Sequence, residues 1–181
     1  MYSVSKIVST KRLAVIAMLV AQAAVLHYLE SLIPNPVPVP GVKLGLANII
    51  TLIALVIFDF RTALEIAIMR TILGSLLAGT LFGMGFFMSF SGAVTSTVVM
   101  ALILRSFNML SMVGISILGA IAHNVGQLIM ATLVLHFPGI FFYLPAMLLF
   151  SIPTGILTGL LTNELVKYIR ATNRVQTLLD D

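Results

Sequence analysis

The stretch SMVGISILGAIAHNVGQLIMATLVL, residues Ser111–Leu135, contains no Asp, Glu, Lys or Arg. A bilayer has a hydrocarbon core about 30 Å thick, which roughly 20 apolar helical residues cross at about 1.5 Å per residue. Ser111–Leu135 is long enough to do so. We therefore predict a transmembrane helix here.

Five further apolar stretches have a similar character, and together they fill most of the chain. The composition agrees, because 60% of the residues are hydrophobic, only 9% are charged and the mean hydropathy is +1.14. A soluble globular domain has fewer hydrophobic residues and more charged residues than this. We predict an all-α integral membrane protein, a bundle of six transmembrane helices. The five stretches are Leu13–Ile33, Leu44–Phe58, Thr62–Leu81, Phe86–Leu104 and Phe141–Asn163.

The positive charges gather in alternate gaps between these stretches. They are Lys6, Lys11, Arg12, Arg61, Arg105, Lys167, Arg170 and Arg174, whereas the remaining gaps hold only Lys43. Under the positive-inside rule, both termini are cytoplasmic and three loops lie outside. The outer loops are Pro34–Lys43, Gly79–Gly85 and His136–Ile140.

This topology divides the chain into residues 1–12, a cytoplasmic amino-terminal segment, residues 13–166, the transmembrane domain, and residues 167–181, a cytoplasmic tail. The expected location is the cell membrane, as a multi-pass protein. The net charge of +4 does not indicate nucleic-acid binding, because the basic residues lie at the ends of apolar stretches rather than on one amphipathic face. Ala21-Gln22-Ala23 also resembles a signal-peptide cleavage site, but the apolar run continues past it.

The first outer loop contains PNPVPVPG, in which alternate prolines favour an extended strap. The strap could be a spacer between helices or a wall over a pocket. Lys43 and the N–H groups at the start of the next helix, near Asn48, would both favour an anion such as a phosphate or carboxylate. The alternative for Lys43 is a side chain that reaches out to the interface.

Polar residues inside the stretches are the best candidates for a site. Arg70 lies near the middle of its stretch, where a charge costs about 2.5–3.5 kcal/mol, so it should face inward and find a partner. His123 and Gln127 share one helical face, with Asn124 about 100° round. Two roles could explain why these three polar residues lie inside an apolar stretch: hydrogen bonds between helices, or a shared ligand pocket. We expect Arg70, His123, Asn124 and Gln127 to line one polar cavity.

Other candidates are weaker. His27 and Glu30 form a lesser pair near the outer end of the first stretch. A metal site is not expected, because His123 has no second His or carboxylate at i+3 or i+4. Ala17 and Ala21 form a small-xxx-small pair near the basic end of the first stretch, where a partner could reach it.

The chain lacks the P-loop pattern G-x-x-x-x-G-K-[ST], and it has no HExxH, nucleophile elbow or CxxC pattern. If the protein performs work, the energy must therefore come from a partner or a gradient.

Four segments together resemble the Gx transporter family, also named heptaprenyl diphosphate synthase component I. The resemblance covers roughly residues 10–165. Its segments are PGVKLGLANIITLIAL (Pro40–Leu55), Arg70 with Gly74, FSGAVTS (Phe90–Ser96) and GAIAHNVGQLIMA (Gly119–Ala131).

That family is similar in plan to the S components of energy-coupling-factor (ECF) transporters, which have six helices and no ATPase motif. In S components an AxxxA motif on the first helix docks on a transmembrane coupling subunit, and Ala17 and Ala21 match that motif. The resemblance implies a substrate-binding subunit that works with this coupling subunit and cytoplasmic ATPases. The ligand, bound beneath the outer loops, would be a flavin, a vitamin or a quinone or prenyl precursor.

The alternative is a non-catalytic membrane subunit that supports polyprenyl diphosphate or quinone synthesis. Prenyl diphosphate synthases hold Mg²⁺ through clustered aspartates, because the leaving diphosphate must be neutralised. This chain has only Asp59, Asp180 and Asp181, which form no DDxxD cluster. We therefore expect neither independent enzymatic activity nor a bound cofactor.

Overall fold

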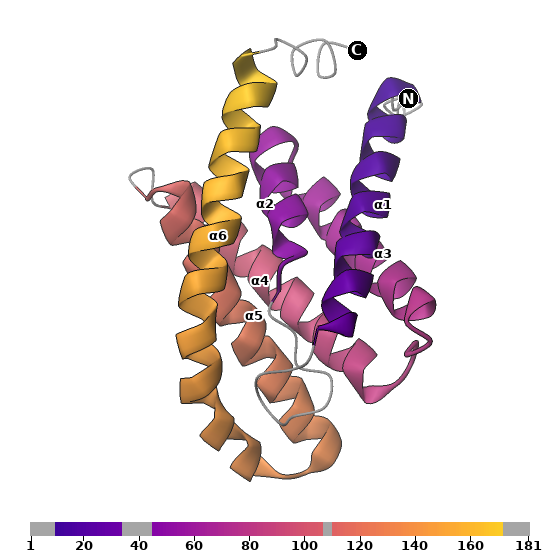
Figure 1. Cartoon of the computed structure of the whole chain (residues 1–181), viewed down its shortest axis with the longest axis vertical. Helices are drawn as coiled ribbons and strands as arrows, with labels where there is room; N and C mark the ends of the chain where they lie inside the picture. Colours follow the sequence, from indigo (N-terminus) through magenta and orange to yellow (C-terminus); the bar gives the residue numbers. More distant parts are fainter. Residues whose placement is uncertain (1–9, 34–44, 107–109, 172–181) are drawn as a thin grey trace, which may run out of the picture.

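The computed structural model describes residues 10–33, 45–106 and 110–171, which form helices and no β-strand (Figure 1). Within these residues the prediction of an all-α protein is confirmed. The predicted outer loop with Lys43 lies outside the described residues. The elements are α1 (Thr10–Leu32), α2 (Asn48–Ile57), α3 (Phe60–Leu77), α4 (Met84–Ser106), α5 (Met112–Leu135), the 3-10 helix η1 (Pro138–Tyr143) and α6 (Leu144–Ala171).

Four helical segments are long and apolar enough to cross a membrane: α1, α4, α5 and the continuous segment Pro138–Ile169. The chain is therefore a multi-pass membrane protein. The helix α3 has 18 residues but carries Arg61, Glu65 and Arg70. The helix α2 has only 10 residues, about 15 Å of helix. Six complete crossings therefore remain a prediction.

The short helix α2 lies at the centre of the bundle and contacts each of the other five α-helices. This position explains its composition, because the sequence NIITLIALVI is apolar on nearly every side and buries Leu52, Ile53 and Ala54. The helix α1 is peripheral and packs only on α2 and α3 among the described elements. One long face of α1 is thus left open.

Glycines set the close approach of α6 to α5. A Cβ atom at Gly155 would lie 2.6 Å from the Cα of Ile117, and one at Gly159 would lie 2.5 Å from the Cα of Val113. Any larger residue would separate the two backbones, so these glycines serve internal packing.

The helix α6 is longer than the stretch Phe141–Asn163. It passes through Pro153 and continues to Ala171, into the segment that the sequence predicts as a polar tail. Val166 is still buried there, and Lys167 pairs with Glu164 at 2.8 Å, so packing and a local ion pair extend the helix.

The bundle has two distinct ends. Figure 1 shows the amino end of α1 and the carboxyl end of α6 at the same end, at the top of the view. We call this the basic end, and the opposite end, where α1 finishes and η1 lies, the loop end. The first residues of α2 and Glu30 of α1 lie toward the loop end, where the candidate site begins.

Candidate ligand-binding site

The site is built around Arg70 of α3, whose side chain is only 1% exposed. Its Nη2 donates a hydrogen bond of 2.8 Å to Oδ1 of Asn48, the first residue of α2. The expectation that Arg70 faces inward and finds a partner is confirmed. A buried arginine with a partner on a neighbouring helix fixes α2 against α3 at this depth.

Glu30 of α1 provides the opposite charge. It is buried, and its carboxylate attracts the Arg70 guanidinium. The same carboxylate accepts hydrogen bonds from the backbone N–H groups of Gly45 and Leu46, the latter at 3.1 Å. The amides that precede α2, from which we expected anion binding, are therefore occupied by a carboxylate of the chain itself.

Gly45 connects this arrangement to α5. Its φ of +82° lies in the left-handed region, which favours glycine. A Cβ atom at this position would lie 3.1 Å from Nδ2 of Asn48 and 3.4 Å from Cδ2 of His123. His123 therefore lies directly beside the turn that leads into α2. We call Glu30, Gly45, Asn48, Arg70 and His123 the polar cluster.

A second glycine brings α4 against the same face of α5. A Cβ atom at Gly92 would lie 2.9 Å from the Cγ of Gln127, from the Cε1 of His123 and from the carbonyl oxygen of His123. The side chains of His123 and Gln127 are thus both enclosed beside α4, as their i,i+4 spacing predicts.

Asn124 points to a different neighbour. Its Nδ2 donates to the carbonyl oxygen of Met147 at 3.1 Å and to Oγ of Ser151 at 2.7 Å, both on α6. The hydrogen bonds between helices that we considered for this residue are present. A ligand role for Asn124 stays a prediction, as it does for Arg70, His123, Gln127, Asn48 and Lys43.

Several buried polar atoms in this region have no hydrogen-bond partner among the described residues. They are Nε of Arg70, Nδ2 of Asn48, Oγ of Ser75 and Oδ1 of Asn124. Each such atom costs about 1–3 kcal/mol if it stays unpaired. Two of them flank the Arg70–Asn48 hydrogen bond, so the centre of the polar cluster holds two donors that have no partner among the described residues.

Glu30 is more important than its sequence context suggests. From the sequence, Glu30 is a lesser candidate together with His27, near the outer end of the first stretch. His27 packs against α3, since a Cβ atom at Gly74 would lie 2.5 Å from its Cδ2. One feature of the sequence could have predicted that Glu30 and Arg70 interact. They are opposite charges within apolar stretches, and each requires a compensating partner there.

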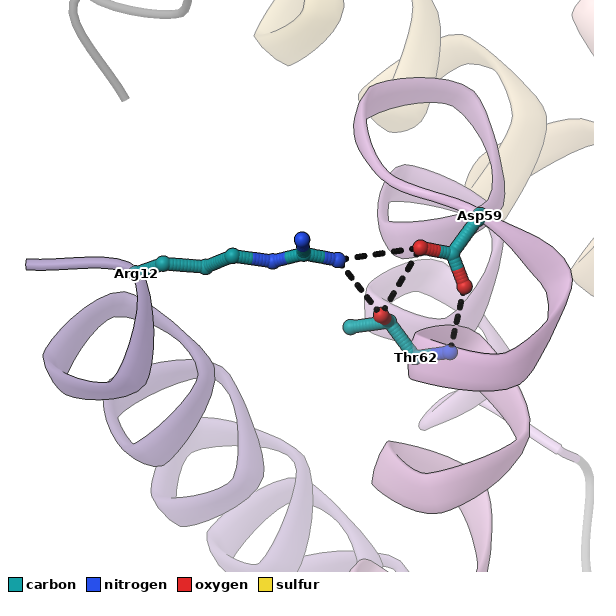
Figure 2. A network of polar contacts seen from close by, with 3 residues as sticks. All are labelled: Arg12, Asp59 and Thr62. Carbon is teal, nitrogen blue, oxygen red and sulfur yellow. Dashed lines mark hydrogen bonds and ion pairs between the residues drawn. The ribbon is translucent and has the colours of Figure 1, made fainter. Parts of the chain in front are cut away.

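A second polar network lies at the basic end (Figure 2). Arg12 of α1 forms an ion pair of 3.0 Å with Asp59 and donates to Oγ1 of Thr62 at 3.2 Å. Asp59 caps α3 by accepting from the Thr62 N–H at 2.8 Å. Arg12 also lies 5.8 Å from the ring centroid of Phe58. We call Arg12, Asp59 and Thr62 the rim network.

The rim network shifts the ionisation of Asp59. Partial burial alone would raise the pKa of its carboxyl group, but the hydrogen bonds from Thr62 and the nearby Arg12 guanidinium outweigh that effect. The pKa of Asp59 is therefore held below its ordinary value, and the carboxylate remains charged at neutral pH.

Ala17 and Ala21 are exposed on the open face of α1, on the same helix as Glu30 and Arg12. Small side chains on an exposed apolar helix permit another helix to approach closely. No set of three His, Asp or Glu residues within the described ranges could hold a metal ion.

Comparison with solved structures places this fold beside a transporter subunit. The chain is similar to a structure described as "Structure and mechanism of the S component of a bacterial ECF transporter", with a TM-score of 0.68 and 22% sequence identity. The similarity covers 91% of this chain and 97% of that chain. The two proteins therefore share a fold over almost their whole length.

Sequence comparison gives the family. No curated protein matches the chain. The sequence model of the family described as heptaprenyl diphosphate synthase component I matches residues 19–165, which confirms the resemblance seen in the four sequence segments. The chain belongs to the heptaprenyl diphosphate synthase component I family.

Proposed function

We propose that the chain is the substrate-binding membrane subunit of an ECF-type importer, with six membrane crossings and both termini in the cytoplasm. The similarity of fold to an ECF S component, over nearly the full length of both chains, carries this proposal. The absence of a P-loop motif from the sequence fits a subunit whose energy comes from partner ATPases.

In this proposal the ligand binds at the polar cluster. The Arg70 guanidinium and the Asn48 amide each keep a buried donor that has no partner among the described residues, and ligand oxygens would satisfy them. Because the Glu30 carboxylate already attracts the Arg70 guanidinium, the ligand need not be an anion. Carbonyl or hydroxyl oxygens on an apolar body meet these requirements, and flavins, several vitamins and quinone precursors have both.

Glu30 would also link ligand binding to the position of α1. Its carboxylate accepts hydrogen bonds from the N–H groups of Gly45 and Leu46, which follow the predicted outer loop Pro34–Lys43. An anionic group that bound at these residues would compete with Glu30 for the same N–H groups. Its arrival would weaken the hold of α1 on the start of α2.

The open face of α1 is the proposed contact with a transmembrane coupling subunit. Ala17 and Ala21 are exposed there, and α1 leaves this face uncovered by the other described helices. Helices pack closely in membranes where small residues face each other, so bulky residues at both positions would hold the partner away.

Purification of the tagged chain from its native membranes tests the proposal. We expect ATPase subunits and a membrane coupling protein to be retained, together with a small molecule that mass spectrometry can identify after denaturation. The double variant Ala17→Leu/Ala21→Leu should lose the protein partners but keep the small molecule. Ala146→Leu, at an exposed alanine of α6, is the matched control and should keep both.

Two results would contradict the proposal. Retention of a soluble prenyl diphosphate synthase without any ATPase would instead support the role in polyprenyl or quinone synthesis. Equal recovery of partners with the parent and the double variant would remove Ala17 and Ala21 from the docking surface.

A further inference from the structure

A groove of about 270 Å³ lies at the basic end of the bundle, away from the polar cluster. It is lined by Phe60, at the start of α3, and by Val98, Ala101, Leu102 and Arg105 in the last turns of α4. The contact between Arg12 and Asp59, the residue before Phe60, places it at the same end as the start of α1. Four of its five lining residues are apolar.

The groove opens to the surroundings of the protein. Phe60 is 42% exposed and Leu102 is 58% exposed, so neither side chain is covered by the described helices. Val98 and Arg105 are seven residues apart, or about 10 Å along the helix axis. The groove therefore extends about 10 Å along α4 from its carboxyl end.

Arg105 gives the groove a polar end. It lies in the last turn of α4, is exposed, and has no hydrogen bond or ion pair with any described residue. Arg61, next to Phe60, is also exposed without such a partner. Arg12, in contrast, is paired with Asp59. Two arginines without a partner among the described residues thus lie at or next to an apolar groove, at the end that the positive-inside rule assigns to the cytoplasm.

We propose that this groove is a binding site for an anionic phospholipid of the cytoplasmic leaflet. One acyl chain lies along Val98, Ala101 and Leu102, and the phosphate of the headgroup meets the Arg105 guanidinium. An arginine presents several N–H donors in a planar fork that matches phosphate oxygens. An interfacial cation also attracts anionic lipid, which corresponds to about a five-fold preference for each positive charge. The site is independent of the importer role.

The chain contains no tryptophan, so a single introduced indole reports on its own surroundings. We would place it in the groove as Leu102→Trp, reconstitute the full chain into phosphatidylcholine vesicles, and add increasing fractions of brominated phosphatidylglycerol. Leu161→Trp, on the exposed face of α6, is the reference position. We expect brominated phosphatidylglycerol to quench the groove indole about five-fold more effectively, per mole fraction, than brominated phosphatidylcholine. At the reference position the two lipids should quench equally.

Two further variants and one control separate the headgroup contact from the acyl contact. Arg105→Gln in the Leu102→Trp background should reduce the preference for phosphatidylglycerol about five-fold. Lys167→Gln, which removes a cation of α6 paired with Glu164, should leave it unchanged. Ala101→Phe fills the groove and should lower quenching by both lipids. Melting temperatures in detergent verify that the variants fold.

Three results would overturn the proposal. The first is equal quenching by the two lipids in the groove, and the second is an unchanged preference in folded Arg105→Gln. The third is an Ala101→Phe variant that binds lipid like the parent but no longer retains a membrane partner in purification. That last outcome would identify the groove as a protein docking surface.

Discussion

The polar cluster and the rim network each tie helices together through an arginine, but in opposite surroundings. Arg70 is almost fully buried and meets Asn48 and the charge of Glu30. Arg12 meets Asp59 at the edge of the bundle, where the two side chains are 33% and 52% exposed. If one charge of a buried pair is removed, the other charge stays buried without compensation. If one charge of an exposed pair is removed, water hydrates the remaining charge.

This difference indicates different roles. Exposed ion pairs contribute little, so the rim network holds the start of α1 beside α3 only weakly. Buried charges in a membrane protein are costly and generally mark a functional site. The Arg70 and Asn48 donors that have no partner among the described residues support that distinction, because each adds a free-energy cost that a bound ligand would offset.

The largest expected effect tests which end of the bundle faces which side of the membrane. The parent has no cysteine, so a cysteine at Gly83, in the turn between α3 and α4, should react with an impermeant thiol reagent in intact cells. A cysteine at Ser106, the last residue of α4, should react only after permeabilisation. Labelling of Ser106→Cys in intact cells would reverse the topology.

The second prediction separates the two arginines by stability. Arg70→Met should lower the free energy of unfolding by about 3–5 kcal/mol, because Glu30 then remains buried without its counter-charge. Thermal unfolding in detergent measures the loss. Glu30→Gln added to Arg70→Met should cost less than the sum of the single variants. Strict additivity would show that the two charges are not coupled.

The helices could be predicted from the sequence because bilayer thickness fixes their length. The predicted stretch Ser111–Leu135 differs from α5 by one residue. The predicted stretch Leu44–Phe58 agrees less well with the structure, because α2 begins only at Asn48. Its start depends on the left-handed Gly45 and on Glu30, which lies in another helix. Apolar composition alone predicts neither the turn at Gly45 nor the contact with Glu30.

The site was predicted less completely. Burial of Arg70 followed from the cost of a charge in hydrocarbon, and the shared face of His123 and Gln127 followed from helical spacing. The partner of each residue depends on which helices are neighbours. Asn124 turned out to bond to α6, and Glu30 turned out to be the counter-charge of Arg70. Sequence spacing within one helix cannot determine either contact.

The third prediction concerns ligand affinity at the α5 face beside the polar cluster. Gln127→Leu and Asn124→Leu should each weaken binding of the co-purified small molecule by about 1–3 kcal/mol, through ligand groups left unpaired. Isothermal titration on folded protein measures this. Ser151→Ala is the control, because Ser151 bonds to Asn124 from α6 and should affect stability rather than affinity. If both leucine variants bind like the parent, the ligand contacts lie elsewhere, under the outer loops.

The smallest effect is expected at the rim network. Arg12→Gln should lower the free energy of unfolding by no more than about 1 kcal/mol at pH 7, because the ion pair with Asp59 is exposed. Arg61→Gln is the matched control, since Arg61 lies at the same end without a described partner, and it should change stability less.

The pH dependence of this small effect identifies its origin. Because the pKa of Asp59 in the folded chain is below its ordinary value of 3.8, its contribution is fully present above about pH 5 and is lost as the pH falls through the folded pKa. The difference between the parent and Arg12→Gln should therefore shrink in acid, and also at high salt, where exposed charges are screened. Unfolding measured at pH 7 and pH 3 tests this. A difference of 3 kcal/mol, or one that neither acid nor salt reduces, would mean that Arg12 is held as firmly as Arg70.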